Sequence, residues 1–271
     1  MTTLAPLRTA SDLDHISYSG MTTYQTCPRK FAYKYLDDDA DEEFLPSSLV
    51  FGGAFHRTVE FVQQAQLEGT DIPDADELLA VFDGVWDEET TDKPSLRFSK
   101  DETPESVREL AKRMFVAYRE HVVSKNEDTQ ILAIEHAHRF RLMANVPAIE
   151  MRIDLLELRG TDLIVTDFKT SKSRWNETRV AESLPQLVLY SHGLLPLVKE
   201  LGATRLVPRF IVISKAKKPV VQVLEPQANQ ADADALKRTV GETWQGIERG
   251  EFKPRSGWHC ALCPFQNRCL G

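Results

Sequence analysis

Residues 148–169 read AIEMRIDLLELRGTDLIVTDFK, and their pattern predicts two adjacent β-strands joined by a turn that contains a glycine. Apolar side chains occupy every second position from Ile149 to Leu155, so the intervening Asp154 is expected on the opposite, polar face. Asp167 and Lys169 are two residues apart and project from the same side of the second strand. The stretch therefore predicts a carboxylate on one strand beside a carboxylate and an amine on the next.

Asp154, Asp167 and Lys169 together suit metal-assisted cleavage of a phosphodiester bond. Carboxylate oxygens are hard ligands for Mg²⁺ or Mn²⁺, which can lower the pKa of a bound water and neutralise a phosphate oxygen. The alternative is a solvated strand end with a surface ion pair. Glu135, on the preceding predicted strand, is expected to be an accessory carboxylate or an ion-pair partner of Arg139.

Two predicted helices carry polar groups that fit the same chemistry. Phe55 and Val59 recur at helical spacing, and His56 lies beside this apolar stripe. Gln186 and Tyr190 are four residues apart and therefore share one helix face. Taken singly, these groups are also typical of a structural histidine and of an amphipathic tyrosine on a helix surface.

Four cysteines stand near the two ends of the chain. Cys27 lies close to the N-terminus, whereas Cys260, Cys263 and Cys269 form a C-x₂-C-x₅-C pattern near the C-terminus. A shared site would join the two ends and stabilise the fold. A Cys₄ zinc site remains open, although such sites usually show two C-x₂-C pairs and only one is present. Disulfides are not expected, because the composition is typical of an intracellular protein and no secretory signal precedes Cys27.

In their order along the chain, these motifs resemble those of the PD-(D/E)XK nuclease superfamily. Its signature is an Asp on one strand, followed on the next by Asp or Glu, any residue and Lys. Asp167-Phe168-Lys169 matches the second half, whereas Ile153 stands where the superfamily's proline would precede Asp154. The G-x-x-x-H motif that ends at His56 and the later Q-x-x-x-Y motif resemble the RecB-like branch. The cysteine pattern resembles the iron–sulfur staple of AddB-type nucleases and of CRISPR-associated adaptation exonucleases.

The resemblance implies a role for each matching residue. A divalent cation, Mg²⁺ or Mn²⁺, would be held by His56, Asp154, Asp167 and the backbone carbonyl of Phe168. Catalysis would depend on Asp154, Asp167, Lys169, Gln186 and Tyr190, and a [4Fe–4S] cluster would be held by Cys27, Cys260, Cys263 and Cys269. Tyr24, Arg29 and Lys30 are nominated for DNA contacts, and the basic residues Lys172 and Arg174, which follow the second strand, are expected to add to them.

The predicted fold is an α/β core with a mixed sheet flanked by helices, as in restriction endonucleases. The chain of 271 residues is expected to form a single nuclease domain, with a helical insertion at about 57–127 that roofs the active-site channel and a cluster region at 17–36 and 250–271. Ser17 or Ser19 is expected to cap the first helix. Strands are predicted at 130–142, 148–158, 163–168, 205–214 and 220–224, and helices at 105–123, around Gln186 and at 230–249.

A net charge of −8 argues against a nucleic-acid enzyme, since phosphate contacts need positive potential. Much of the acid lies in the tracts 37–43 and 71–92, which contain no Lys or Arg and are expected to be solvated loops or helix faces. By contrast, residues 205–218 are basic, and Arg205 and Arg209 are expected to contribute to a basic surface near the chemistry. No apolar run is long enough to span a membrane, and the expected compartment is the cytoplasm.

The function expected from the resemblance is a metal-dependent DNA exonuclease that acts on single-stranded ends in recombination and repair. Two alternatives remain open. One is a CRISPR adaptation nuclease that trims spacer precursors, and the other is a DNA-binding subunit that holds DNA for a partner helicase without cutting it. The chain has no G-x-x-x-x-G-K-[ST] phosphate loop, so any unwinding would come from a partner.

Overall fold

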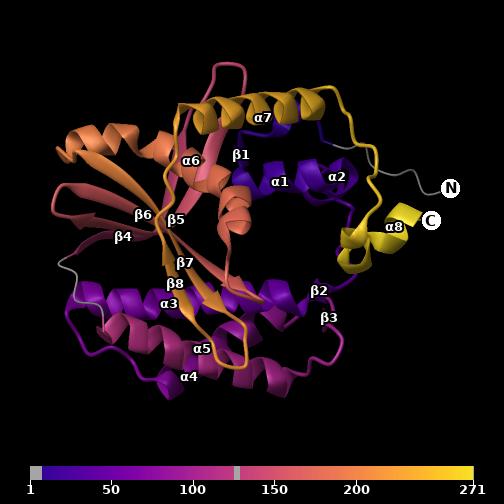
Figure 1. The fold of residues 1–271 in the computed structure, drawn as a ribbon. Helices are drawn as coiled ribbons and strands as arrows, with labels where there is room; N and C mark the ends of the chain where they lie inside the picture. The colour runs from indigo at the N-terminus through magenta and orange to yellow at the C-terminus, as the bar shows by residue number, and fades with distance from the viewer. Residues whose placement is uncertain (1–7, 125–128, 271) are drawn as a thin grey trace.

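The computed structural model describes residues 8–124 and 129–270, which form a mixed sheet between two helical layers (Figure 1). Within these ranges the sheet has six strands: β1 (His15–Ser17), β4 (Gln130–Phe140), β5 (Ala148–Arg159), β6 (Asp162–Ser171), β7 (Arg205–Ser214) and β8 (Val221–Leu224). A two-stranded sheet pairs β2 (Leu45–Pro46) with β3 (Leu96–Arg97). The predicted antiparallel meander, β4 to β5 to β6, is confirmed, and β7 then pairs parallel with β6. The predicted α/β fold with a mixed sheet and flanking helices is therefore correct.

The helices follow local sequence signals. They are α1 (Tyr18–Thr26), α2 (Pro28–Tyr35), α3 (Ser47–Glu68), α4 (Ala75–Thr90), α5 (Pro104–Ser124), α6 (Glu177–Glu200), α7 (Gln230–Glu248) and α8 (Gln266–Leu270), with short 3₁₀ turns at Ala10–Asp12 and Trp258–Leu262. Ser17 caps α1 as predicted, because its Oγ accepts a hydrogen bond from the Gly20 N–H at 3.1 Å. Cys27 and Pro28 separate α1 from α2, because proline has no N–H for a continuous helix but fits the first helical position.

Two strands share one edge of β5 and leave a notch in the sheet between them. β4 pairs with β5 along the other edge. On the shared edge, β1 pairs parallel with Ala148–Glu150, and β6 pairs antiparallel with Leu155–Arg159. Residues 151–154 of β5 therefore have no strand partner on this edge among the described residues. β1 was not predicted, because a strand of three residues is too short to show a period of two in the sequence.

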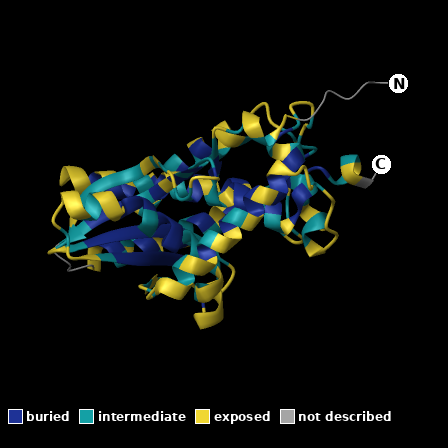
Figure 2. Cartoon of the chain, turned by 90° about the horizontal axis from the view of Figure 1, so that it is seen from above, coloured by how far each residue is buried: buried dark blue, intermediate teal, exposed yellow. Residues whose placement is uncertain are grey.

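Helical layers cover both faces of the sheet. Leu155, Phe168 and Ile211 pack against α3, α4 and α5, whereas Ile153, Leu156 and Val165 pack against α6 on the opposite face. Ile153 and Leu156 lie on the same face although they are three residues apart, so the expected alternation is broken at Asp154. In Figure 2 the strands form a buried centre, and the helices turn their exposed sides outward.

The helices that were predicted to roof the active-site channel form a layer of the hydrophobic core instead. Val59, Leu78 and Phe115, from α3, α4 and α5, are each at most 2 % exposed and belong to the cluster that includes Phe168 of the sheet. The predicted start of the insertion at 57 lies within α3, and the predicted end at 127 lies outside the described residues. The insertion therefore supports the sheet from below, as Figure 1 shows.

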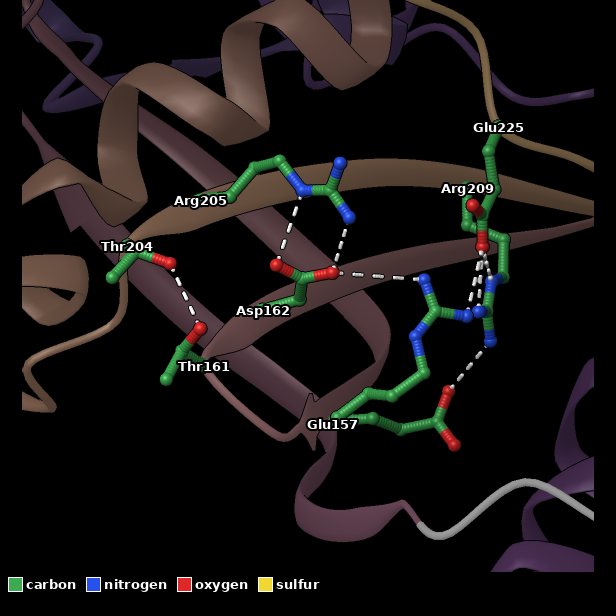
Figure 3. A network of polar contacts seen from close by, with 8 residues as sticks. Glu157, Thr161, Asp162, Thr204, Arg205, Arg209 and Glu225 are labelled. Carbon is green, nitrogen blue, oxygen red and sulfur yellow. Dashed lines mark hydrogen bonds and ion pairs between the residues drawn. The ribbon is translucent and has the colours of Figure 1, made fainter.

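A network of ion pairs ties β5, β6, β7 and β8 together at the end of the sheet away from the notch (Figure 3). Arg209 is 1 % exposed and donates to Glu157 at 3.2 Å and to Glu225 at 2.6 Å. Arg205 pairs with Asp162 on the neighbouring strand. Arg209 is buried among carboxylates, so the prediction that it contributes to a basic surface is wrong. Arg205 is 64 % exposed, but it pairs with Asp162 at this end of the sheet and therefore does not lie near the notch.

The acidic tract 37–43 anchors the C-terminal tail. Asp37 pairs with Arg268 at 2.8 Å, and the Glu43 carboxylate accepts a hydrogen bond from the Asn267 N–H at 2.8 Å. The side chain of Asp37 is only 7 % exposed, so its expected role as part of a solvated loop is incorrect. The tract 71–92 is largely α4, where Asp76 and Asp83 pair with basic residues of α5.

None of the described helices is both long enough and apolar enough to cross a lipid bilayer.

Candidate active site

Asp154 lies in the notch between β5 and β6. Its Oδ2 accepts a hydrogen bond from the Phe168 N–H at 2.6 Å, so the carboxylate satisfies a backbone donor at the point where the strand ladder ends. The Phe168 ring packs edge-on against Tyr118 of α5, which anchors β6 at this point. Burial raises the pKa of Asp154 well above its ordinary value, and the negative charge of Asp167 raises it further. A positive charge in the notch would relieve both effects.

Asp167 and Lys169 project from β6 towards α6. The Lys169 Nζ lies 2.7 Å from Asp167 Oδ2, and the Gln186 Nε2 donates to Asp167 Oδ1 at 2.7 Å. The same Gln186 nitrogen lies 2.8 Å from the Tyr190 hydroxyl. The four side chains predicted from the D-x-K and Q-x-x-x-Y motifs are therefore brought together. Asp167, which is 2 % exposed, is held by the ammonium on one oxygen and by the amide on the other.

His56 reaches the notch from α3 on the other side of the sheet. Its Nδ1 lies 3.5 Å from Asp154 Oδ2, and its ring hydrogen-bonds the Phe168 backbone. Burial, and then the positive charge of Lys169, lower the pKa of His56 to about 4, so the imidazole is neutral at physiological pH. A neutral imidazole is the form that binds a metal ion.

Glu135 completes a group of three metal-binding side chains with His56 and Asp154. One ligand atom from each of these residues lies within 4.8 Å of the others, whereas Asp167 is turned towards Lys169. Glu135 has a φ of 48°, a left-handed conformation that costs energy in a residue other than glycine. Burial raises its pKa to about 7, and the nearby Glu60 contributes. This strained, partly buried carboxylate is a stronger candidate ligand than the sequence indicated.

A cavity of about 460 Å³ opens from the notch towards the N-terminal end of α1. Lys169, Gln186 and Tyr190 line one side of it, and Tyr18 and Arg152 line other parts. The cavity occupies the stretch of β5 that lacks a strand partner on this edge, so the sharing of that edge by β1 and β6 creates the space. The cavity gives access from the surface to Lys169, Gln186 and Tyr190, whereas Asp154 and Asp167 are not among the residues that line it.

A model of the PD-(D/E)XK nuclease superfamily matches residues 15–270. The chain belongs to this superfamily. A crystal structure described as a putative exonuclease from Eubacterium rectale has a similar fold: it shares 14 % identity with a TM-score of 0.55, and the match covers 94 % of this chain and 88 % of that one. A second solved structure, SSO0001, shares 16 % identity with a TM-score of 0.34, over 84 % of this chain and 87 % of that one. None of the curated proteins matches the sequence.

The superfamily's strand motif thus lies at the notch, but the residues nominated for DNA contacts are spread over different environments. Tyr24 is 7 % exposed, packs edge-on against Phe31 and donates a hydrogen bond to the Glu251 carbonyl at 3.0 Å. Its ring is part of the core, so base stacking by Tyr24 is not supported. Lys172 and Arg174 are exposed beyond the end of β6, and their contribution to DNA contacts stays a prediction.

The four cysteines, far apart in the sequence, line one cavity between the α1–α2 junction and the C-terminal tail. Arg29 and Lys30 line the same cavity and therefore lie beside the cysteines. Burial raises the pKa of the Cys263 thiol, and the neighbouring Cys27 and Cys260 raise it as well. The predicted meeting of the two ends of the chain at the cysteines is confirmed.

One wall of the candidate active-site cavity of this superfamily member is formed by the start of α1, which was not predicted from the sequence. Ser17, Tyr18, Ser19 and Thr22 all line it. Ser17 was identified as a helix cap, but no local signal shows that this cap faces Lys169, because β1 must first pair with β5. Arg152, on β5 two residues before Asp154, also lines the cavity and lies 3.8 Å from Glu135.

Proposed function

We propose that this protein is a metal-dependent DNA exonuclease of the RecB-like and AddB-like branch that acts on single-stranded ends. The observation that carries the proposal is the notch between β5 and β6, where Asp154, Asp167 and Lys169 meet His56 from one helical layer and Gln186 from the other. A surface ion pair does not explain this arrangement, because Asp154 and Asp167 are largely buried and repel one another. Costly clustered charge of this kind is typical of active sites.

The donor atoms at the notch fit a divalent cation such as Mg²⁺ or Mn²⁺. His56, Glu135 and Asp154 offer one nitrogen and two carboxylate oxygens within 4.8 Å of one another, and we propose that Asp167 and the Phe168 carbonyl complete the set. When bound, such a cation neutralises phosphate charge and activates water. The combination of a neutral imidazole and carboxylates of raised pKa explains why the site favours binding of positive charge.

Lys169 is proposed to stabilise the negative charge that builds up on the phosphate during cleavage. Asp167 holds the ammonium at 2.7 Å, and Gln186 fixes the other oxygen of Asp167, so the lysine is oriented before the substrate arrives. Burial raises the pKa of the Tyr190 hydroxyl, and the charge of Asp167 raises it further, so the group remains protonated and can donate a hydrogen bond. Gln186 and Tyr190 are therefore positioning residues for Asp167, Lys169 and the strand being cut.

The cysteine cavity is proposed to hold a [4Fe–4S] cluster. In a tetrahedral zinc site with Zn–S bonds of about 2.3 Å, the sulfurs lie about 3.8 Å from one another. Among the described residues, no three of the cysteines have their sulfurs within 4.8 Å of one another. This spacing supports a cluster, in which each thiolate binds a different iron, over zinc. The cluster would fasten the tail to the α1–α2 junction through Cys27.

The nuclease proposal is tested with anaerobically purified protein and end-labelled single-stranded or duplex DNA in Mg²⁺ or Mn²⁺. We expect metal-dependent release of label from single-stranded ends. Lys169→Ala should reduce the rate by about 10²-fold or more, the effect of removing one preorganised charge-stabilising group. Lys199→Ala, on the exposed end of α6, is the matched control and should cut like the wild type.

The same assay separates the exonuclease from a DNA-holding subunit of a helicase complex. Wild-type protein that binds single strands but does not cut them with either metal would overturn the enzyme proposal in favour of the holding role. Equal cutting by wild type and Lys169→Ala would remove Lys169 from the mechanism. The choice between repair and CRISPR adaptation depends on partners, which copurification with a helicase or with adaptation proteins would identify.

A further inference from the structure

A second cavity lies directly beside the active-site cavity. It has a volume of about 450 Å³ and is enclosed by α1, α6 and α7. Tyr18 and Thr22 line both cavities, so only these two side chains of α1 are shared between them. On α6, Pro185 lines the second cavity and the next residue, Gln186, lines the active-site cavity. A group in the second cavity would therefore lie next to a substrate bound at Lys169.

The walls of the second cavity do not suit a phosphate group. Met21, Val188 and Leu236 form part of an apolar floor, and Glu182 and Asp232 place carboxylates at its edge. Neither lysine nor arginine is present among the described residues that line it. Glu182 does pair with Arg179 at 3.0 Å, but both side chains are 58 % exposed, so this pair is at the solvent-facing rim. An anionic backbone would meet repulsion and no compensating cation.

The same walls suit a nucleobase. A base has flat apolar faces that can pack on an apolar floor, and amino groups at its edge that can donate to carboxylate or amide oxygens such as those of Asp232 and Gln25. A volume of about 450 Å³ falls in the range of roughly 300–1,000 Å³ that small-molecule sites span. Tyr18 packs partly against the core and offers an aromatic ring at the entrance from the active site. Burial raises the pKa of its hydroxyl, and the negative charge of Asp167 raises it further.

We propose that the α1–α6–α7 cavity is a base-binding subsite that holds the nucleobase adjacent to the phosphodiester bond being cut, with Tyr18 as the wall between base and phosphate. The inference rests on the proposed nuclease function. It gives a physical reason for a single-strand preference, because a base can enter the cavity only when it is unpaired and unstacked. The cavity thereby selects single-stranded or frayed ends without a basic surface that reads the backbone.

The proposal is tested by binding in EDTA, so that the result does not depend on cleavage. Single strands carry one 2-aminopurine, placed in turn at each position along the strand. We expect its fluorescence to rise at one position, where the base leaves the stack of its neighbours and is enclosed in the cavity. Ala235→Phe, which fills the cavity from an exposed position on α7, should remove this rise and weaken binding by about 5- to 150-fold, the effect of losing one stacked base.

Ala231→Phe is the matched control, because Ala231 is exposed on the same helix but does not line the cavity. It should retain both the fluorescence rise and the affinity. The subsite is overturned if Ala235→Phe and Ala231→Phe bind and fluoresce like the wild type, or if the wild type shows a rise at no position. Since the assay contains no metal, a protein that cuts DNA normally but fails this test loses the base subsite and keeps its nuclease function. A protein that passes this test without cutting DNA keeps the subsite and loses the exonuclease proposal.

Discussion

Replacing Glu135 with glutamine should make the metal-free protein more stable at alkaline pH while weakening its binding of metal. Glu135 is partly buried near Glu60 and Asp167, and its pKa is raised to about 7 from an ordinary value of 4.5. Between these pH values the folded protein holds a proton that the unfolded chain releases. Stability therefore falls as the pH rises through this window, because the ionised carboxylate must remain in the fold. The glutamine amide would keep the shape of the side chain without the charge.

The size of the effect follows from the two pKa values. Each pH unit between them corresponds to about 1.4 kcal/mol, so the charge of Glu135 costs at most about 3 kcal/mol at pH 8. The side chain is 21 % exposed, and solvent screening should reduce this to about 1–2 kcal/mol. For a chain of this size, that difference raises the Tm by about 2–8 °C.

The prediction is checked by urea and thermal unfolding of wild type and Glu135→Gln at pH 5 and pH 8 in EDTA. The variant should gain stability relative to the wild type as the pH rises. Adding Mn²⁺ should reverse the order at pH 8, since wild type at a metal concentration of about 100 Kd gains about 2.7 kcal/mol and the variant binds more weakly. Glu109→Gln, an exposed carboxylate on α5, is the matched control and should follow the wild type. Parallel pH curves for wild type and Glu135→Gln, or an equal response to Mn²⁺, would refute the reasoning.

Three further predictions address other parts of the molecule. Gln186→Ala removes the donor to Asp167 Oδ1, which should raise the activation free energy of cleavage by about 1–3 kcal/mol and slow a single-turnover reaction roughly 5- to 150-fold. An unchanged rate would show that this amide does not position Asp167. Arg209→Met leaves the buried Glu157 charge without this partner and should lower the free energy of unfolding, measured by urea denaturation, by about 3–5 kcal/mol. Adding Glu157→Gln to this variant should restore much of the loss, whereas additive losses in the double variant would contradict the ion-pair explanation. Cys263→Ser should lower iron content, visible absorbance and Tm together, and a wild-type protein that contains zinc without iron or sulfide would exclude the cluster.

The local pattern determined most of the elements that carry the site. The apolar run of 205–214 defined β7 to the residue, and the apolar period of α5 and α7 fixed these helices within a residue of their observed bounds. The two-residue spacing of Asp167 and Lys169 and the four-residue spacing of Gln186 and Tyr190 were sufficient to place each pair on one face. These features are readable because the periods of strands and helices are set by the backbone itself.

The tertiary structure alone decided how these elements combine. β1 pairs with β5 across more than a hundred residues, and this pairing leaves the notch in which Asp154 lies and creates the cavity beside Lys169. The tertiary structure also decided that Glu135 joins His56 and Asp154, and that Arg209 is buried among carboxylates. Sequence periodicity shows which face of an element is apolar, but not which partner covers it. Partner choice depends on packing and electrostatics between distant segments. The sequence by itself therefore determined the superfamily's motif and the fold class, whereas the shape and charge of the candidate site required the assembled sheet.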